Sequence, residues 1–531
     1  MGFIMSFSRW FIIIALFVPF LHASRFLIIF GPENGSHFMM CARIGQTLAS
    51  RGHSVTFLIS ENLEEILDQY HFENITLEIY PTMIPKRTIL NLQTRLSKEL
   101  ITGNIALQTL LHLGDEMFHV LENSTIDTLG NSALMHRLQN QNFDLVFFDI
   151  LYIYPVFIAK KLKVPFAPMS FMVSLDITAW INRADFSTSY YPGQSVYDNQ
   201  MTLMQRLQNT LRSKVMLVFQ HYYFARTHHV KDHFGICPDK STVEMLGKAE
   251  LLFMRTHFAL DFPRSLPAHV VPIGGILTKP AAPLSQDLNA FVESSGDSGV
   301  IVFSLGTYVN YMEEEQALLF KQAFSQLGEK VIWRFLGDSP GNISRNTLTL
   351  PWIPQNDILG HTQTRLLIYH CGSNGVFEAL YHAVPIICLP LFADQFGVAA
   401  RVVSKGIGLQ LDITSLTSDK LVRAIRHVVD NQSYKNNMKR LSTIFKDEPM
   451  GSPMNRAVYW MEFIGKHGNA SHLRSSAHDL NFIQYHLIDV IATLLLSAVV
   501  SIAVIFKSLQ FVCRLFFVEG NSKKSGTFKN D

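Results

Sequence analysis

"LIYHCGSNGVFEALYHAVPIICLPLFADQ", Leu367 to Gln395, is the stretch of sequence that decides the fold. Two apolar runs in it lie on either side of a segment of helical length, and each run ends in small or polar residues. Short apolar runs of this kind are typical of strands that are buried on both faces of a parallel sheet. Where such strands lead into helices, the helix N-terminus binds anions through its free N–H groups and its dipole. The stretch therefore predicts a β–α–β unit that holds a ligand at the ends of its strands.

The same alternation continues on both sides of this stretch. Residues 25–30, 54–60 and 143–149 are predicted strands of a first half, with helical segments between them. Strands and helices alternate again over 299–430, after a segment rich in Pro and Gly at 272–286 that we interpret as a linker. We therefore expect an α/β fold with two halves that face a cleft, which is the default ligand site of such folds.

The composition narrows the function. The 531 residues suffice for more than one domain. Lys and Arg number 45 against 43 Asp and Glu, and no basic stripe stands out, so nucleic-acid binding has no electrostatic support. The five cysteines show neither metal-ligand spacing nor a dense disulfide pattern; they are Cys41, Cys237, Cys371, Cys388 and Cys513.

Both ends of the chain carry apolar segments. Residues 1–24 have the layout of a cleavable signal peptide, with an uncleaved anchor as the alternative. Residues 487–507 approach the length of a membrane-spanning helix, with a buried core helix as the alternative. A signal peptide and a membrane helix place residues 25–486 in the lumen or outside, and the basic tail 508–531 in the cytosol. Six N-x-[ST] triplets agree with that side, and they begin at Asn34, Asn74, Asn123, Asn342, Asn431 and Asn469.

The loop after the strand that ends near residue 370 has the residue types that bind phosphate. A glycine lets the backbone approach a phosphate closely, and His and Asn side chains donate to its oxygens. The segment "FSLGTY" (303–308) repeats the arrangement of a strand followed by small residues. The candidates for phosphate binding are His370, Gly372, Ser373, Asn374, Gly306 and Thr307.

Other polar residues near these loops suit a nucleotide sugar. Glu378 lies one turn into the predicted helix, where its carboxylate can accept from ribose hydroxyls. Asp394 and Gln395 end the next strand, and a carboxylate beside an amide suits the vicinal hydroxyls of a sugar. Trp352 can stack on a base and Gln355 can bond it, although a core tryptophan is the plainer interpretation. The combination predicts a cradle for a nucleotide sugar.

The first half has a candidate base of its own. His37 follows the first strand and opens the next helix, and Asp149 ends a strand that a parallel sheet can set beside that loop. An Asp behind a His fixes the tautomer and stabilises the cation formed on proton uptake. The alternative is that His37 caps a helix and Asp149 bonds local backbone, and spacing alone favours this alternative slightly.

The segment "WIPQNDILGHTQTRLLIYHCGSNGVFEALYHAVPIICLPLFADQ" resembles the signature of the animal UDP-glycosyltransferases, the UDP-glucuronosyltransferase family. The similarity extends to "RGHSVTFL", "FMRTHFALDFPR", "VIVFSLGT" and the C-terminal apolar segment. The resemblance implies a GT-B fold, in which two Rossmann-like domains face a cleft, with the acceptor in the N-terminal domain and the UDP-sugar in the C-terminal one. It also implies direct displacement with inversion at the anomeric carbon, and no metal or resident cofactor.

Family membership would also give each matched residue a role. His37 matches the general base that acts on the acceptor hydroxyl, and Asp149 matches its orienting partner. The residues matched to donor binding run from uracil and ribose through the phosphates to the sugar; they are Trp352, Gln355, Glu378, Gly306, Thr307, His370, Gly372, Ser373, Asn374, Asp394 and Gln395.

Three positions depart from the family pattern, and one bears on the donor. The family usually has threonine or serine at Tyr369, glycine or alanine at Cys371, and glycine at Ala383. Arg255 matches an arginine that glucuronate users aim at the sugar carboxylate, which favours UDP-glucuronate and a small lipophilic acceptor. Similarity of "GGILTKPAAPL" to the branch that galactosylates ceramide keeps UDP-hexose transfer to a lipid or steroid open, and Cys371 and Ala383 keep a catalytically silent, ligand-binding relative open.

We expect an endoplasmic reticulum membrane protein with a single span and lumenal catalytic domains. Homo- or hetero-oligomers with related transferases are left open by the resemblance. The expected division of the chain is a signal peptide at 1–24, an acceptor domain at 25–271, a linker at 272–286, a UDP-sugar domain at 287–440, returning helices at 441–486, a membrane helix at 487–507 and a cytosolic tail at 508–531.

Overall fold

The structure is a computed structural model that describes residues 23–32, 35–64, 72–82, 84–102, 107–170, 181, 187–193, 195–307, 309, 312–336, 341 and 343–522. The predicted signal peptide, apart from residues 23 and 24, lies outside the described residues. The same holds for the triplets at Asn34 and Asn342 and for residues 523–531 of the predicted tail.

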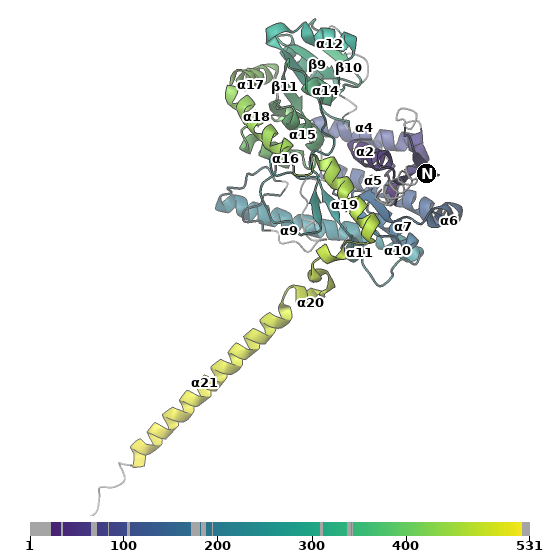
Figure 1. The fold of residues 1–531 in the computed structure, drawn as a ribbon. Coiled ribbons are helices and arrows are strands. Elements are labelled where there is room, and N and C mark those ends of the chain that lie inside the picture. Colours follow the sequence, from purple (N-terminus) through teal and green to yellow (C-terminus); the bar gives the residue numbers. More distant parts are fainter. Residues whose placement is uncertain are drawn as a thin grey trace, which may run out of the picture. The chain divides into compact units, whose positions relative to one another are not determined.

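Within the described residues, the first half of the chain forms a parallel sheet of seven strands (Figure 1). Apolar runs such as "RFLII" and "LVFFD" form its centre, and nearly all their side chains are buried, as expected for a sheet covered on both faces. The strands lie in the order β3 (Ile75–Tyr80), β2 (Ser54–Ser60), β1 (Arg25–Ile29), β4 (Leu145–Asp149), β5 (Phe166–Met169), β6 (Leu252–Met254) and β7 (Val270–Pro272).

A second parallel sheet, of six described strands, follows in the chain. Its strands lie in the order β10 (Thr347–Leu350), β9 (Lys330–Arg334), β8 (Val300–Ser304), β11 (Thr364–Tyr369), β12 (Ile386–Cys388) and β13 (Gly408–Gln410). In both sheets the order reverses at the first strand of the half, β1 or β8, because later strands are added on its other side. Open parallel sheets of this kind bind ligands at that switch point, beyond the carboxyl ends of the strands.

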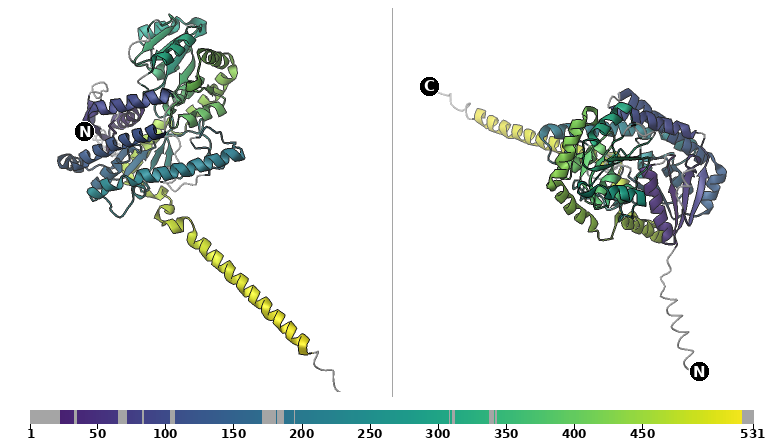
Figure 2. Two further views of the ribbon diagram at one scale, coloured as in Figure 1. Left: turned by 180° about the vertical axis from the view of Figure 1, so that it is seen from behind. Right: turned by 90° about the horizontal axis from the view of Figure 1, so that it is seen from above.

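Helices pack against both sheets (Figures 1 and 2). Those of the first half are α2 (Ser36–Ser50), α4 (Lys86–Thr102), α5 (Leu107–Gly130), α6 (Ser132–Asn140), α7 (Pro155–Leu162), α9 (Leu203–Ala225), α10 (His228–His233) and α11 (Thr242–Leu246). Those that follow are α12 (Gln286–Glu293), α13 (Glu314–Phe324), α14 (Gln355–Leu359), α15 (Ser373–Tyr381), α16 (Gln395–Ser404), α17 (Ser418–Asp430), α18 (Gln432–Lys446) and α19 (Pro453–His467).

The last helix of this series, α19, returns to the first half. Val458, Met461 and Ile464 are fully buried and belong to the same apolar cluster as Phe26 of β1 and Phe57 of β2. The chain therefore crosses between its halves twice, once through the segment after β7 and once before α19. The domain boundaries drawn from the sequence stay predictions.

The sequence patterns predicted the long elements better than the short ones. The segment 60–140 was expected to be mostly helical, but it also contains the edge strand β3. Strands β6 and β7 have three residues each, too few to show periodicity, and they extend the sheet only because β5 is already in place.

Residues 475–531 form a separate compact unit. Its described part contains α20 (Phe482–Tyr485) and α21 (Ile488–Ser522), and residues Ile488–Leu515 of α21 are long and apolar enough to cross a membrane. The membrane helix was predicted to end at 507. The helix itself continues beyond that residue, where Phe511, Val512 and Leu515 maintain the apolar sequence, and the bounds of the membrane span stay a prediction.

One disulfide was missed by the sequence analysis. Cys371, in the loop after β11, is bonded to Cys388, the last residue of the neighbouring strand β12, and their Cα atoms lie 5.4 Å apart. Tyr369 pairs with Cys388 in the sheet register, and this pairing brings the two thiols together. Among the described residues Cys41, Cys237 and Cys513 are free.

The bridge gives a first prediction. It closes a loop of 17 residues, and replacing both Cys371 and Cys388 by serine is expected to lower the free energy of unfolding by about 3 kcal/mol. Denaturant unfolding of the purified full chain measures this change. Alkylation of the unreduced, denatured protein should modify Cys41, Cys237 and Cys513 and spare the bridged pair. Modification of Cys371 and Cys388 in that experiment would contradict the assignment.

Candidate active site

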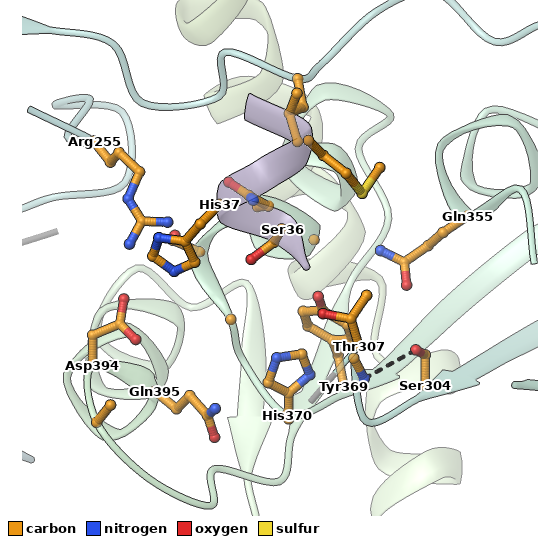
Figure 3. A pocket seen from close by; sticks show the side chains of 18 of the residues that line it. Ser36, His37, Arg255, Ser304, Thr307, Gln355, Tyr369, His370, Asp394 and Gln395 are labelled. Atoms are coloured by element: carbon orange, nitrogen blue, oxygen red, sulfur yellow. Dashed lines mark hydrogen bonds between the residues drawn. The ribbon is translucent and has the colours of Figure 1, made fainter. Parts of the chain in front are cut away.

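A cavity of about 810 Å³ lies between the carboxyl ends of the two sheets (Figure 3). Helix α2 and the loops after β4 and β6 line it from the first half, and the loops after β8, β10, β11 and β12 line it from the second, together with Arg334 at the end of β9. All the donor-site and catalytic candidates from the sequence line the cavity except Asp149, which is buried behind His37. The structure thus brings residues from both halves to one space.

His37 and Asp149 are in contact although 112 residues separate them in the chain. Strand β1 pairs with β4, with Ile29 opposite Phe148, so the loop that follows β1 runs past the end of β4. The Nδ1 atom of His37 lies 2.7 Å from Oδ2 of Asp149, whose side chain is 1% exposed. The other oxygen, Oδ1, accepts from the backbone N–H of Leu151 at 2.9 Å. Asp149 therefore bonds local backbone and His37 at once, whereas the alternative in which His37 caps a helix is wrong, because the N-cap of α2 is Gly35 and no side chain of the described residues caps it.

Two glycines make room for the ring of His370 in the phosphate region. A Cβ atom on Gly306 would lie 2.1 Å from Cε1 of His370, and one on Gly372 would lie 2.5 Å from its Nε2, so neither position accepts a side chain as the ring stands. The N–H of Gly306 already donates to Oγ of Ser304 at 3.2 Å (Figure 3). The contribution of Gly306 to this region is therefore the space that it leaves for the ring of His370. Burial and, as a smaller cause, the charge of Arg334 lower the pKa of His370 to about 3, so the imidazole is neutral.

The N-terminus of α15 points its first backbone N–H groups at the same region. Gly372 is the N-cap, and no side chain of the described residues caps the helix. Ser373 and Asn374 open the first turn, and both line the cavity. An uncapped helix N-terminus that faces a cavity suits a diphosphate.

A second group of polar side chains lies where the sequence predicts ribose and uracil. Nε2 of Gln355 donates to Oε2 of Glu378 at 2.7 Å. Burial raises the pKa of Glu378 to about 7 despite this bond. Trp352 is 53% exposed at the cavity and is not a core residue, and the guanidinium of Arg334 lies 5.5 Å from its ring. Arg334 also donates to the carbonyl of Gly306 at 2.5 Å. The sequence analysis did not single out Arg334 as a site residue, although a cation at the end of an apolar strand was a usable signal.

Arg255 and Asp394 face the cavity from opposite halves (Figure 3). Arg255 is 5% exposed and its Nε donates to the carbonyl of Ser170 at 3.0 Å. Burial lowers the pKa of Arg255, and the carboxylates of Asp394 and Asp149 oppose that change. Burial raises the pKa of Asp394, and Arg255 and then His37 oppose it. The two side chains are thus close enough to feel each other's charge.

Gln395 has only part of its amide free for a ligand. It is expected, beside Asp394, to bond the vicinal hydroxyls of a sugar. Its Oε1 atom accepts from the backbone N–H groups of Leu391 and Phe392, at 2.7 and 3.1 Å. Only the NH₂ group of Gln395 remains to contact a ligand, and the buried carbonyl oxygen holds the loop in shape.

The rest of the cavity is an apolar chamber in the first half. Acceptor contacts are expected from residues 60–130 and 170–220. Within the described residues, α4 and α5 of the first range line the chamber, and α2, Tyr152 and Tyr223 line it as well. Its apolar and aromatic lining residues are Met39, Ala42, Leu92, Leu96, Leu113, Met117, Leu121, Leu151, Tyr152 and Tyr223, and the polar Arg43 and Gln46 of α2 also line the cavity. A chamber of this composition, with His37 at its edge, suits an apolar molecule that carries one reactive polar group.

Two of the departures from the family pattern lie at left-handed backbone positions. Cys371 has φ 61° and Ala383 has φ 57°, where glycine would meet no steric penalty. The ring of Tyr369 packs against Gly375, where a Cβ would lie 2.4 Å from Cζ. None of the three side chains closes the cavity.

A profile of the family described as "UDP-glucoronosyl and UDP-glucosyl transferase" matches residues 26–524. The chain belongs to this family. Human UDP-glucuronosyltransferase 2B15 is 35% identical to this UDP-glycosyltransferase over 527 residues, covering 97% of the chain and 98% of the relative. Rat UDP-glucuronosyltransferase 1A5 is 32% identical over 514 residues, covering 96% of the chain and 95% of the relative.

Solved structures support the fold. The glycotransferase of kitacinnamycin matches with a TM-score of 0.58 at 16% identity, covering 83% of this transferase and 99% of that chain. CalG4, the calicheamicin glycosyltransferase, matches with a TM-score of 0.56 at 16% identity, covering 83% and 98%. The fold of the transferase is therefore GT-B, with two Rossmann-like parallel sheets, as expected.

The raised pKa of Glu378 gives a second prediction. A ribose hydroxyl needs the ionised carboxylate as acceptor, and the ionised fraction falls as the pH drops below about 7. Uridine should therefore bind about tenfold more weakly at pH 6 than at pH 8. Uridine is used, measured by calorimetry, because it has no group that titrates in this range. The Glu378→Gln variant should bind weakly at both pH values, and a pH dependence that persists in it would contradict the assignment.

Proposed function

We propose that this UDP-glycosyltransferase moves glucuronic acid from UDP-glucuronate to a hydroxyl group of a small lipophilic acceptor, with inversion at the anomeric carbon. The contact between His37 and Asp149 at the edge of the apolar chamber carries the proposal. It unites a base, its orienting carboxylate and an apolar acceptor space, facing a donor site in the other half.

The chemistry needs one proton acceptor and one stabilised leaving group. The acceptor oxygen forms a bond to C1 of the sugar as the bond from C1 to the UDP oxygen breaks. Because Nδ1 of His37 is held by Asp149, Nε2 takes the proton of the acceptor hydroxyl, and the carboxylate stabilises the imidazolium. The departing diphosphate gains negative charge, which the first turn of α15 stabilises through its N–H groups.

The choice of glucuronate depends on Arg255. Its buried guanidinium in the cavity, near Asp394, leaves a cation where the donor sugar is expected. A carboxylate on the sugar pairs with that cation more strongly than a hydroxymethyl group does, because a charge-assisted hydrogen bond is the stronger one.

The chain has a membrane-length helix in Ile488–Leu515, and its curated relatives are UDP-glucuronosyltransferases. With the predicted signal peptide, this supports an enzyme of the endoplasmic reticulum membrane that spans it once, with both sheets in the lumen and the basic tail in the cytosol.

The roles of His37 and Asp149 give a third prediction. His37→Ala should lower kcat by about 10²- to 10⁴-fold, because the acceptor hydroxyl loses its base. Asp149→Asn should also lower kcat, because the imidazolium loses its stabilising charge. Both are measured as product formation in membranes that contain the full chain. UDP should bind both variants as well as it binds the wild type, since the predicted UDP contacts lie in the second half. Full turnover by His37→Ala would refute the assigned base.

The donor assignment gives a fourth prediction. Membranes with the wild-type chain are incubated with phenols, steroids and ceramide, and with UDP-glucuronate, UDP-glucose, UDP-galactose or UDP-N-acetylglucosamine in parallel. Mass spectrometry should detect transfer of glucuronic acid. Arg255→Met should reduce that transfer by about 10- to 100-fold, the worth of one hydrogen bond between charged groups, and Arg255→Lys should reduce it less. Transfer of a hexose alone by the wild type would move the protein to the lipid-glycosylating branch, and bound UDP without any product would support a silent relative.

A further inference from the structure

The helix that begins at the donor-sugar contacts also carries a buried arginine. Asp394 is the N-cap of α16 and Gln395 is its first residue. Arg401 lies six residues further on, about 9 Å along the helix axis. Its side chain is 2% exposed, and the carboxylate that it meets, Asp261, is 1% exposed.

Arg401 joins the two halves through the Nε and Nη2 atoms of its guanidinium. Nε donates to Oδ1 of Asp261 at 2.5 Å, and Nη2 donates to the carbonyl of Gly193 at 2.9 Å and to the hydroxyl of Tyr191 at 3.1 Å. These three partners belong to the first half of the chain. Nη1 donates to the carbonyl of Gly397 at 2.6 Å, within α16 itself. The side chain is therefore braced on its own helix and bonded across to the other half at three points.

The partner carboxylate is linked to the donor site in its turn. Oδ2 of Asp261 accepts from the hydroxyl of Thr256, the residue next to Arg255. The backbone N–H of Phe262 donates to Oδ1 of Asp261 at 3.0 Å. The same short loop after β6 thus holds Asp261 and presents Arg255 to the cavity.

We propose that Arg401 is a positioning residue that holds α16 in register with the first half, so that Asp394 and Gln395 meet the donor sugar opposite Arg255 and His37. The inference rests on the proposed function, in which both halves contact the sugar. The four residues Arg401, Asp261, Tyr191 and Gly193 are called the latch below.

Loss of the latch should weaken binding of the sugar and leave binding of the nucleotide unchanged. Trp352, Gln355 and Glu378 all lie in the second half, so they bind uridine whatever the register of α16. The sugar is expected to lie between Asp394 of the second half and Arg255 of the first, so it depends on the latch. Lysine at position 401 keeps the charge, but it lacks the fork of donors that reaches three acceptors.

Arg401→Lys is a variant that should still fold. Nη1 of Arg264 lies 3.5 Å from Oδ2 of Asp261, so the buried carboxylate keeps a cationic neighbour. Tyr191→Phe is milder still, because it removes one hydroxyl group of the latch. Arg426→Lys is the matched control: Arg426 pairs with the buried Glu329 at 2.9 Å, and both residues lie in the second half.

The experiment measures the affinities of UDP and UDP-glucuronate for the purified full chain by calorimetry, together with turnover. UDP should bind wild type, Arg401→Lys and Tyr191→Phe within a factor of two. The gain in affinity that the glucuronic acid adds over UDP should fall at least tenfold in Arg401→Lys and by less in Tyr191→Phe. Donor hydrolysis by water relative to acceptor transfer should rise in the same order, and Arg426→Lys should behave as wild type.

The outcomes separate the latch from the proposed function. A sugar-dependent gain that is present in the wild type and unchanged in Arg401→Lys overturns the latch alone. Equal losses of UDP and UDP-glucuronate affinity also overturn it, since they indicate a general structural role. A wild type with neither a sugar-dependent gain for UDP-glucuronate nor turnover of it overturns the proposed function and the latch with it.

Discussion

Strand direction is the constraint on which the site depends. Within the described residues both sheets are wholly parallel, so all their strands end at one edge, and the two edges face one cavity. Asp149 ends β4, Arg255 follows β6, Arg334 ends β9 and His370 follows β11. An antiparallel strand in any of these places would carry its polar end to the opposite edge of the sheet. Helices that start at the same edge add their N-termini to the cavity, which is why α2 and α15 both open there.

Burial then sets the charge of each polar group at that edge. The same loss of solvent raises the pKa of Glu378 to about 7 and lowers that of His370 to about 3. Burial also disfavours the ionised forms of Arg255 and Asp394. The opposite charge of each side chain counteracts this effect on the other. A bound UDP-sugar brings negative charge to this region, close to cations and a helix N-terminus. These groups therefore stabilise a bound anionic donor more than they stabilise water in the same place.

The join between the halves needs its own interactions, because the linker and α19 only tether them. The apolar packing of α19 in the cluster that contains Phe26 of β1 and Phe57 of β2 is buried contact without a preferred register. The hydrogen bonds of Arg401 are directional, so they define how α16 meets the loops of the first half. At this interface, apolar packing therefore holds the halves together, and the hydrogen bonds fix their relative register.

The sequence by itself determined the alternation of strands and helices, the two-half architecture and the character of the ligand. Apolar periodicity and the residues at strand ends are local properties, so "YHCGSNG" and "FADQ" indicated a nucleotide-sugar cradle without reference to distant residues. Resemblance to the family raised the pair His37 and Asp149 above its structural alternative. The short strands at the edge of the first sheet could not be predicted from the sequence, because they exist only where a neighbouring strand is present.

Only the tertiary structure decided which distant residues meet. His37 reaches Asp149 because β1 pairs with β4, and Cys371 reaches Cys388 because β11 pairs with β12. The contact of Arg401 with Asp261 spans 140 residues and two halves. Chain separation carries no information about such distances; strand order and the docking of the halves do. Many residues that line the cavity were therefore readable from the sequence, whereas the bond of Cys371 to Cys388 and the contact of Arg401 with Asp261 were not.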